Sequence, residues 1–332
     1  MNYRSFSDLD ACIARNLSKI PADVDIIAGI PRSGLLPATA LALHLNLPLT
    51  DLQGVIEGRL FSHGPRLPLD RQVTVNNARR IAVVDDSVGL GQEMQRTRAK
   101  IEAAGLRDKV VYVAIYAADD SVGKVDIAFE VCPLPRVFAW NLMHTPMLSR
   151  ACVDIDGVLC VDPSEEENDD GPRYLHFIET ARPLLRPTRE IGTLVTCRLE
   201  KYRPQTERWL QLHGIKYREL TMWDLPSKAA RIASQGHAAY KASAFQAHPE
   251  ADFFIESSAA SAQAIANLTA RPVICIESQR DHRAILRQRL SKRISRAVVS
   301  RVTSLEWVPR DMRRLLLATR AWVLRLSRFA LD

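Results

Sequence analysis

Apolar residues in this chain come in short continuous runs that alternate with longer amphipathic stretches. In the first 140 residues, DIIAGI and RIAVVDD are apolar runs, and they are followed by the amphipathic stretches LLPATALALHL and GQEMQRTRAKIEAAG. A strand that is buried on both faces reads as a continuous apolar run, whereas a surface helix carries apolar residues every third or fourth position. The alternation therefore predicts βαβ units and a parallel sheet.

A second alternating series begins at ACVDIDGVLC, and its later strand-like runs are GTLVTC, DFFIES and PVICIE. The chain has 332 residues, and a domain usually takes roughly 100 to 200, so two domains are expected. The fold class predicted is α/β, with two Rossmann-like parallel-sheet domains and a basic helical tail. Their expected limits are 1–147, 148–279 and 280–332.

The positive charge of the chain is concentrated at its C-terminal end. The formal net charge is +7, but residues 280–332 hold 14 Arg and Lys against 4 Asp and Glu, a local +10. The remaining residues therefore sum to −3. Any partner inferred from the basic character concerns the tail, and not the two predicted domains.

The tail has the pattern of a basic amphipathic helix. Its apolar residues recur at three- and four-residue spacing, at Met312, Leu315, Leu316, Trp322, Val323, Leu326 and Phe329, and arginines fill the other face. Such a helix fits an anionic membrane surface. Packing on the body of the protein or in a dimer explains the apolar face equally well. Nucleic acid is not expected, because no stacking-aromatic platform accompanies the charge.

No targeting or redox signal points away from the cytoplasm. The sequence has no run of about 18 uncharged apolar residues, and its first residues lack the basic-then-apolar order of a secretory signal. The six cysteines show no C-x-x-C spacing and are expected to be buried thiols. We therefore expect a cytoplasmic protein, with peripheral contact at the inner membrane face if the tail binds lipid.

The run RRIAVVDDSVGLGQEM places candidate binding residues at the end of a predicted strand. A buried strand ends in Asp85 and Asp86, a glycine-containing turn follows, and a helix begins near Gln92. A turn before a helix N-terminus presents backbone N–H groups to an anion, and two carboxylates accept hydrogen bonds from vicinal hydroxyls. A phosphorylated sugar satisfies both halves, although an ordinary turn with an Asp-rich cap explains the stretch as well.

This stretch resembles the signature of the type I phosphoribosyltransferases, in which apolar residues precede two acids and a short loop that closes in glycine. The resemblance implies that Asp85 and Asp86 hold the ribose 2′ and 3′ hydroxyls of phosphoribosyl diphosphate (PRPP). It implies that loop amides hold the 5-phosphate, at Val88, Gly89, Leu90, Gly91 and Gln92. That family usually has Ser or Thr where this chain has Leu90 and Glu93, so backbone contacts are expected to carry phosphate binding.

A second match precedes the first, because DIIAGIPRSGLLPATALA resembles the first strand and diphosphate-binding loop of the same family. Arg32, Ser33 and Gly34 there supply a cation and permissive backbone, which suit the diphosphate leaving group. Between the two motifs, GRLFSHGPRLPLDRQ has the composition of a mobile loop that closes over the diphosphate, with Gly58, Arg59, Gly64, Arg66 and Arg71. Any exposed loop could share that composition.

The second series opens with two aspartates two residues apart. Asp154 and Asp156 stand at a predicted strand end, and Gly157 bends the chain so that both can approach one ligand. Later runs end in Thr196 and in Glu256. A D-x-D pair on a strand is common by chance, so these later residues are what make the pattern specific.

Over roughly residues 150–278 this pattern resembles the haloacid dehalogenase (HAD) superfamily of phosphatases. The resemblance implies that Asp154 is the nucleophile, Asp156 the general acid/base and Thr196 a phosphoryl anchor. It implies that the phosphoryl-binding lysine is Lys241, fifteen residues before the last acid, with Lys228 as the alternative. It also implies Mg²⁺ as cofactor, with the expected metal ligands Asp154, Asp156 and Glu256.

The two resemblances together predict a bifunctional enzyme. A PRPP-dependent phosphoribosyltransferase, acting as a glycosyltransferase, would add ribose 5-phosphate to a glycan or lipid-linked oligosaccharide acceptor. The HAD phosphatase, a hydrolase, would then leave a β-ribofuranosyl residue, and this domain order resembles bacterial fusions implicated in surface polysaccharide biosynthesis. The alternatives are a nucleobase phosphoribosyltransferase with a housecleaning phosphatase, and a non-catalytic PRPP-binding sensor.

Overall fold

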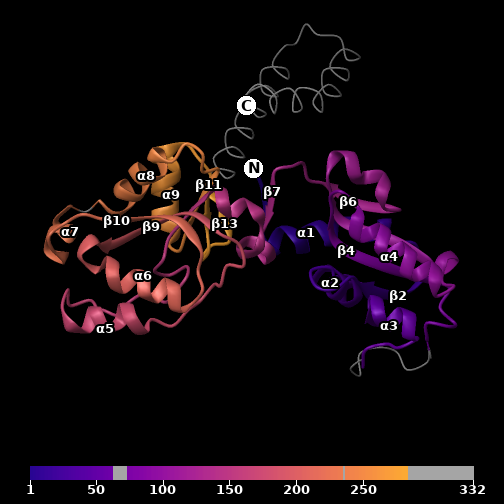
Figure 1. Cartoon of the computed structure of the whole chain (residues 1–332). Helices are drawn as coiled ribbons and strands as arrows, with labels where there is room; N and C mark the ends of the chain where they lie inside the picture. Colours follow the sequence, from indigo (N-terminus) through magenta and orange to yellow (C-terminus); the bar gives the residue numbers. More distant parts are fainter. Residues whose placement is uncertain (63–72, 235, 283–332) are drawn as a thin grey trace, which may run out of the picture. The chain divides into compact units, whose positions relative to one another are not determined.

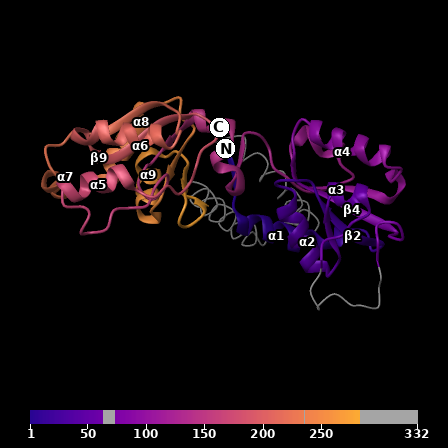
Figure 2. The ribbon, with the colours of Figure 1, turned by 60° about the horizontal axis from the view of Figure 1, so that its bottom comes forward.

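The computed structural model describes residues 1–62, 73–234 and 236–282. Within them lie two large, mainly parallel sheets and a small sheet of two strands, whose elements can be followed by label and colour in Figures 1 and 2. The prediction of an α/β protein with parallel sheets is confirmed. The predicted division at residues 147 and 148 stays a prediction.

The first sheet has five parallel strands, so sequence-distant segments end at a common edge. Across the sheet they are β3 (Leu49–Asp51), β2 (Val24–Gly29), β4 (Arg80–Val88), β5 (Val110–Ala117) and β6 (Ile127–Val131). The helices of this half are α1 (Phe6–Asn16), α2 (Leu35–Leu45), α3 (Leu52–Glu57) and α4 (Gln92–Ala103). The helix expected near Gln92 begins at that residue.

Alternate residues of these strands sort onto two apolar cores because successive side chains of a strand point to opposite faces. Ile27 packs in a cluster with Leu41 of α2, and α1 contributes to the same cluster. Its neighbour Ile26 packs in another cluster with Val55 of α3 and Met94 of α4. Burial on both faces explains why the strands read as continuous apolar runs.

The second sheet has six strands and is parallel except at its last strand. Across the sheet they are β10 (Tyr217–Trp223), β9 (Ile191–Leu199), β8 (Ala151–Val153), β11 (Phe253–Glu256), β12 (Val273–Cys275) and β13 (Arg280–Asp281). Its helices are α5 (Pro172–Thr180), α6 (Arg203–Leu212), α7 (Lys228–Ser234), α8 (His237–Ala247) and α9 (Ala259–Thr269).

Both faces of the second sheet are also covered. Leu194 of β9 packs in a cluster with Phe177 of α5 and Trp209 of α6. The next residue, Val195, packs in a second cluster with Phe245 of α8, and α9 contributes to that cluster. Because β8, β9 and β11 are parallel neighbours, their carboxyl ends lie at one edge of the sheet, where the side chains that follow them can meet.

The segment between the sheets contains β7 (Arg136–Phe138), which pairs in parallel with β1 (Asn2–Arg4), and then the 3₁₀ helices η4 (Ala139–His144) and η5 (Pro146–Arg150). Arg280 and Asp281, which the sequence placed at the start of the tail, form β13 of the second sheet. The amphipathic pattern predicted for the tail lies outside the described residues. Within them, no helix combines the length and apolar character that a membrane crossing requires.

Candidate functional sites

The two loops of the first predicted site leave from the same edge of the sheet. β2 and β4 are parallel neighbours, with Gly29 opposite Val84, and the Ile30 N–H donates to the Val84 carbonyl oxygen at 2.9 Å. A Cβ on Gly34 would lie 2.6 Å from that same oxygen, closer than any side chain tolerates. The loop that follows β2 can thus pack against the end of β4, at the residue before the acidic pair, because Gly34 has no side chain.

The acidic pair lies at the carboxyl end of β4 and is poorly solvated. Asp86 is buried, Asp85 is half-buried, and the Asp86 N–H donates to Asp85 Oδ1 at 2.9 Å. Burial, together with the charge of Asp86, raises the pKa of Asp85 to about 8. Burial also raises the pKa of Asp86, against the effect of a hydrogen bond from Trp140. The pair can therefore hold a proton at neutral pH.

The segment between the two large sheets contributes two side chains of η4 to this site that the sequence reasoning missed. Trp140 Nε1 donates to Asp86 Oδ2 at 2.6 Å. Asn141 Nδ2 donates to Ser33 Oγ at 3.3 Å, and Arg32 Nη2 donates to Asn141 Oδ1 at 3.3 Å. The signal available in the sequence was an indole and an amide donor in residues 132–150, between the two predicted domains, but nothing local indicated which loops they would contact.

The loop predicted to bind phosphate runs from the end of β4 to the start of α4. Val88 ends the strand, Gly91 has a left-handed φ of 80° as the residue before the helix, and Gln92 is the first helical residue. In the described ranges, the backbone N–H groups of Gly89, Leu90 and Gly91 donate to no acceptor. The Leu90 side chain is exposed. The loop therefore offers backbone donors beside the N-terminus of a helix of twelve residues.

The loop expected to close over the diphosphate is only partly described. Gly64, Arg66 and Arg71 lie outside the described residues. Gly58 ends α3 with a φ of 73°. Arg59 forms ion pairs with acidic residues of its own neighbourhood, at 3.4 Å and 3.7 Å. Its role in closing the loop stays a prediction.

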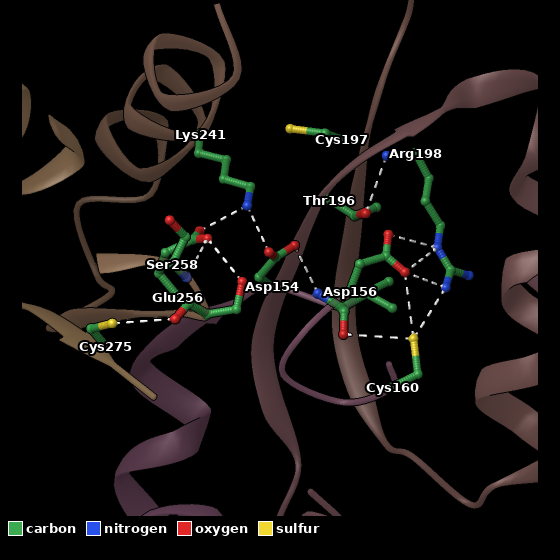
Figure 3. Close-up of polar contacts among 12 residues, drawn as sticks. Asp154, Asp156, Cys160, Thr196, Cys197, Arg198, Lys241, Glu256, Ser258 and Cys275 are labelled. Atoms are coloured by element: carbon green, nitrogen blue, oxygen red, sulfur yellow. Dashed lines mark hydrogen bonds and ion pairs between the residues drawn. The ribbon is translucent and has the colours of Figure 1, made fainter. Parts of the chain in front are cut away.

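The second predicted site is built around a buried lysine (Figure 3). Lys241 Nζ of α8 donates to Asp154 Oδ2 at 2.6 Å and to Glu256 Oε2 at 2.7 Å. All three side chains are at least nine-tenths buried. Lys228 instead donates through Nζ to the Asn168 carbonyl oxygen. Of the two candidate lysines, the structure thus brings Lys241 to the predicted nucleophile.

The electrostatics of this cluster follow from burial and charge pairing. Burial raises the pKa of Asp154 to about 7, with Glu256 and Asp156 acting in the same direction and Lys241 against them. Burial alone would lower the pKa of Lys241, but the two carboxylates raise it above its usual value. The lysine is therefore charged and serves as the counterion that lets an ionised Asp154 exist at this depth.

Asp156 has a different partner, which the sequence reasoning also missed. Arg198 is wholly buried; its Nη2 donates to Asp156 Oδ1 at 2.6 Å, and its Nε lies 3.1 Å from both oxygens. Cys160 Sγ lies 3.4 Å from Asp156 Oδ1 and 3.3 Å from Arg198 Nη2. Arg198 stands two residues after Thr196, and a cation inside the apolar run of β9 was the available signal.

Two further predicted residues are placed by backbone geometry. Gly157 has a φ of 74°, and a Cβ there would lie 2.5 Å from the Cβ of Ser257, next to Glu256. The chain after Asp156 can therefore turn back against the loop that follows β11. Thr196 is wholly buried, and its Oγ1 accepts a hydrogen bond from the Arg198 N–H at 3.2 Å. Its predicted role as phosphoryl anchor stays a prediction.

The predicted metal ligands are not gathered as a set of three. Over the described part of the chain, no group of three or more His, Cys, Asp or Glu side chains is arranged to hold a metal ion. Asp156 turns toward Arg198, whereas Asp154 and Glu256 face one another across Lys241. Carboxylate oxygens are the donors that Mg²⁺ prefers. Asp154 and Glu256 therefore offer donors of the right kind for a divalent cation, although each has one oxygen on the Lys241 ammonium, and the metal role expected for Asp156 is opposed by its pairing with Arg198.

Solved structures with partial similarity to this chain include three of interest. A purine phosphoribosyltransferase from Pyrococcus horikoshii Ot3 is 19% identical, and the match covers 42% of this chain and 92% of that chain with a TM-score of 0.32. The Helicobacter pylori xanthine-guanine-hypoxanthine phosphoribosyltransferase is 14% identical, and the match covers 42% of this chain and 92% of that chain with a TM-score of 0.32. A Neisseria gonorrhoeae protein with bound ppGpp is 15% identical, and the match covers 42% of this chain and 89% of that chain with a TM-score of 0.31.

Other comparisons give no match. No family model matches the chain, and no curated protein matches it. With TM-scores below 0.5, the similarities to solved structures carry no argument. The assignment of function therefore rests on the residues and contacts of the chain itself.

Proposed function

We propose that this chain is a bifunctional enzyme that transfers 5-phosphoribosyl from PRPP to a hydroxyl of a glycan acceptor and then removes the 5-phosphate. The observation that carries the proposal is the presence in one chain of two acidic sites with complementary chemistry. One joins an adjacent carboxyl pair to an amide-lined loop, and the other pairs a buried carboxylate with a lysine. A product of phosphoribosyl transfer carries the phosphate that the second site would remove.

In the first step, Asp85 and Asp86 would accept hydrogen bonds from the ribose hydroxyls, and Arg32 would hold the departing diphosphate. The acceptor oxygen forms a bond to the anomeric carbon while the bond from that carbon to the diphosphate oxygen breaks. The acceptor proton goes to a carboxylate of the acidic pair, whose raised pKa favours proton uptake. Attack opposite the departing diphosphate gives a β-linked ribose.

In the second step, an Asp154 oxygen would bond to phosphorus while the ester oxygen leaves and takes a proton from Asp156. Water then attacks the aspartyl phosphate, gives its proton to Asp156 and releases inorganic phosphate. Arg198, whose Nη2 donates to Asp156 Oδ1, would hold that carboxyl group in place for both displacements. Asp154 and Glu256 would hold Mg²⁺, which supplies charge neutralisation for the phosphoryl oxygens.

The acceptor class follows from the order of the two reactions. A newly made nucleotide that loses its phosphate at once would waste the transfer, whereas an acceptor that must end with plain ribofuranose needs both steps. A lipid-linked glycan at the membrane face would also give a purpose to the basic sequence at residues 283–332.

The test supplies the full-length protein with PRPP, Mg²⁺ and either a lipid-linked oligosaccharide mimic or nucleobases, and follows diphosphate and inorganic phosphate. We expect diphosphate and phosphate only with the glycan mimic. Asp154→Asn should stop at a 5-phosphoribosylated product, and Asp86→Asn should release neither ion. Reaction with nucleobases alone would favour a nucleobase phosphoribosyltransferase, and binding of PRPP without turnover would favour a sensor.

A further inference from the structure

Three side chains from other parts of the first half contact the carbonyl groups of the predicted phosphate loop. Arg136 Nη2 donates to the Val88 oxygen at 2.8 Å. Ser121 Oγ donates to the Gly89 oxygen at 2.5 Å, and Lys124 Nζ donates to the same oxygen at 3.2 Å. Ser121 and Lys124 belong to η3 (Asp119–Lys124), which follows β5, and Arg136 begins β7.

These contacts determine where the loop amides point. In a planar trans peptide the C=O and the following N–H point in opposite directions. The Val88 carbonyl oxygen accepts from Arg136 and also from the Ala118 N–H at 3.2 Å, so the Gly89 N–H points the other way. A Gly89 carbonyl that faces Ser121 and Lys124 does the same for the Leu90 N–H. Neither of these N–H groups has an acceptor in the described ranges.

Lys124 also contacts the loop at a second point. A Cβ on Gly91 would lie 2.6 Å from Lys124 Cδ, so the stem of the lysine packs directly on the bare Cα of this glycine. Gly91 has a φ of 80°, which favours glycine as well. The contact holds the lysine stem under the loop, so that its ammonium group stays at the Gly89 carbonyl.

The side chains of the loop offer an anion only the amide NH2 of Gln92, so the backbone supplies most of its donors. Val88, Gly89, Leu90, Gly91 and Gln92 include no cation and no hydroxyl. The phosphate affinity of this loop therefore depends on how well its N–H groups are aimed, and on positive charge nearby. Ser121 is wholly buried, so its hydroxyl has a fixed place from which to orient the peptide.

We propose that Ser121, Lys124 and Arg136 are positioning residues that aim the Gly89 and Leu90 amides at the phosphate of the donor. The inference rests on the proposed function for its ligand, the 5-phosphate of PRPP. The two cations stand behind the peptide units, on the carbonyl side, and reinforce the polarity of the amides. They act through the loop backbone and do not need to touch the ligand.

The test measures binding of ribose 5-phosphate, and separately of Mg²⁺-diphosphate, by isothermal titration calorimetry. Arg136→Met and Lys124→Met should each weaken ribose 5-phosphate binding by about tenfold, the effect of one charge-assisted hydrogen bond. Diphosphate binding should not change. Arg136→Lys, which keeps a donor for the Val88 carbonyl, should restore most of the affinity. The matched control is Arg98→Met, which removes a cation of α4 that pairs with Asp126.

Turnover adds a second readout. For each positioning variant the KM for PRPP should rise by about tenfold while kcat stays within about twofold, because the amides hold the phosphate equally in substrate and transition state. Ser121→Ala, a milder change at a buried position, should show the same pattern with a smaller rise. Equal weakening of ribose 5-phosphate and diphosphate in the variants would overturn the inference, as would wild-type affinity for ribose 5-phosphate.

Amide NMR with inorganic phosphate separates this inference from the proposed function. In wild-type protein, phosphate should shift the Gly89 and Leu90 resonances, and Arg136→Met should reduce those shifts at equal phosphate concentration. If these shifts occur but no acceptor reacts with PRPP, the proposed function fails and the positioning role stands. If phosphate leaves both resonances unmoved in the wild type, the positioning role is refuted whatever the enzyme assay gives.

Discussion

Replacing Arg198 with Met should be among the most destabilising single changes in the second half of the chain. The Arg198 side chain is 0% exposed and the Asp156 side chain is 19% exposed. The variant therefore leaves the Asp156 carboxylate poorly hydrated and without its counterion. At a separation of about 4 Å and an effective dielectric constant of about 20, the lost attraction is about 4 kcal/mol. Breaking a buried pair by removing one partner costs about 3–5 kcal/mol. We expect a loss of about 3 kcal/mol, because Asp156 regains some water.

The measurement is urea unfolding followed by far-UV circular dichroism and extrapolated to water. Arg208→Met is the matched control, since Arg208 pairs with Glu179 at 3.0 Å but both side chains are exposed, and the loss should stay below about 1 kcal/mol. A double mutant with Asp156→Asn should cost at least about 2 kcal/mol less than the sum of the single changes. Additive effects, or a loss no larger than that of the control, would refute the assignment of a coupled buried pair.

Three further changes test the electrostatics of both sites. Asp85→Asn removes a carboxyl whose pKa is about 8 in the fold against an ordinary 3.8, so the wild type should lose stability relative to the variant as pH rises from about 4 to about 8; a pH-independent difference in urea midpoint contradicts this. Lys241→Met leaves two buried carboxylates without their counterion and should cost about 3–5 kcal/mol at pH 8 but less at pH 5, because Asp154, whose pKa is raised to about 7, is protonated there; equal losses at both pH values contradict it. Trp140→Phe keeps the ring but loses the N–H to Asp86 and should cost about 1.5–3 kcal/mol, so an unchanged thermal midpoint would count against that hydrogen bond.

The strands and the helix starts were accessible from the sequence because their causes are local. Burial of a strand on both faces requires an unbroken apolar run, as in β4, and a helix that begins after a left-handed glycine is readable at Gly91 and Gln92. Parallel neighbours end at one edge, so residues at two strand ends meet without further information. The resemblance had assigned the acidic pair and the loop at Gly34 to one ligand, and the structure shows that β2 and β4 are neighbours, with Gly34 packed against the Val84 carbonyl oxygen.

The residues that the sequence reasoning missed have one physical reason in common. Arg198, Trp140, Lys124 and Arg136 act through contacts between segments that no periodic pattern relates. A cation inside an apolar run was visible, but only the folded chain shows that its partner is Asp156. The pairing with Arg198 also argues against Asp156 as a metal ligand, since a carboxylate held by a buried guanidinium has few lone pairs left to coordinate a cation.

The contacts of η4 bear on how PRPP could enter the first predicted site. Trp140 donates to Asp86, and Asn141 joins Arg32 and Ser33, so the protein satisfies with its own groups the positions assigned to ribose hydroxyls and diphosphate. Arrival of the donor then exchanges one set of hydrogen bonds for another, and its net affinity is the difference between the two sets.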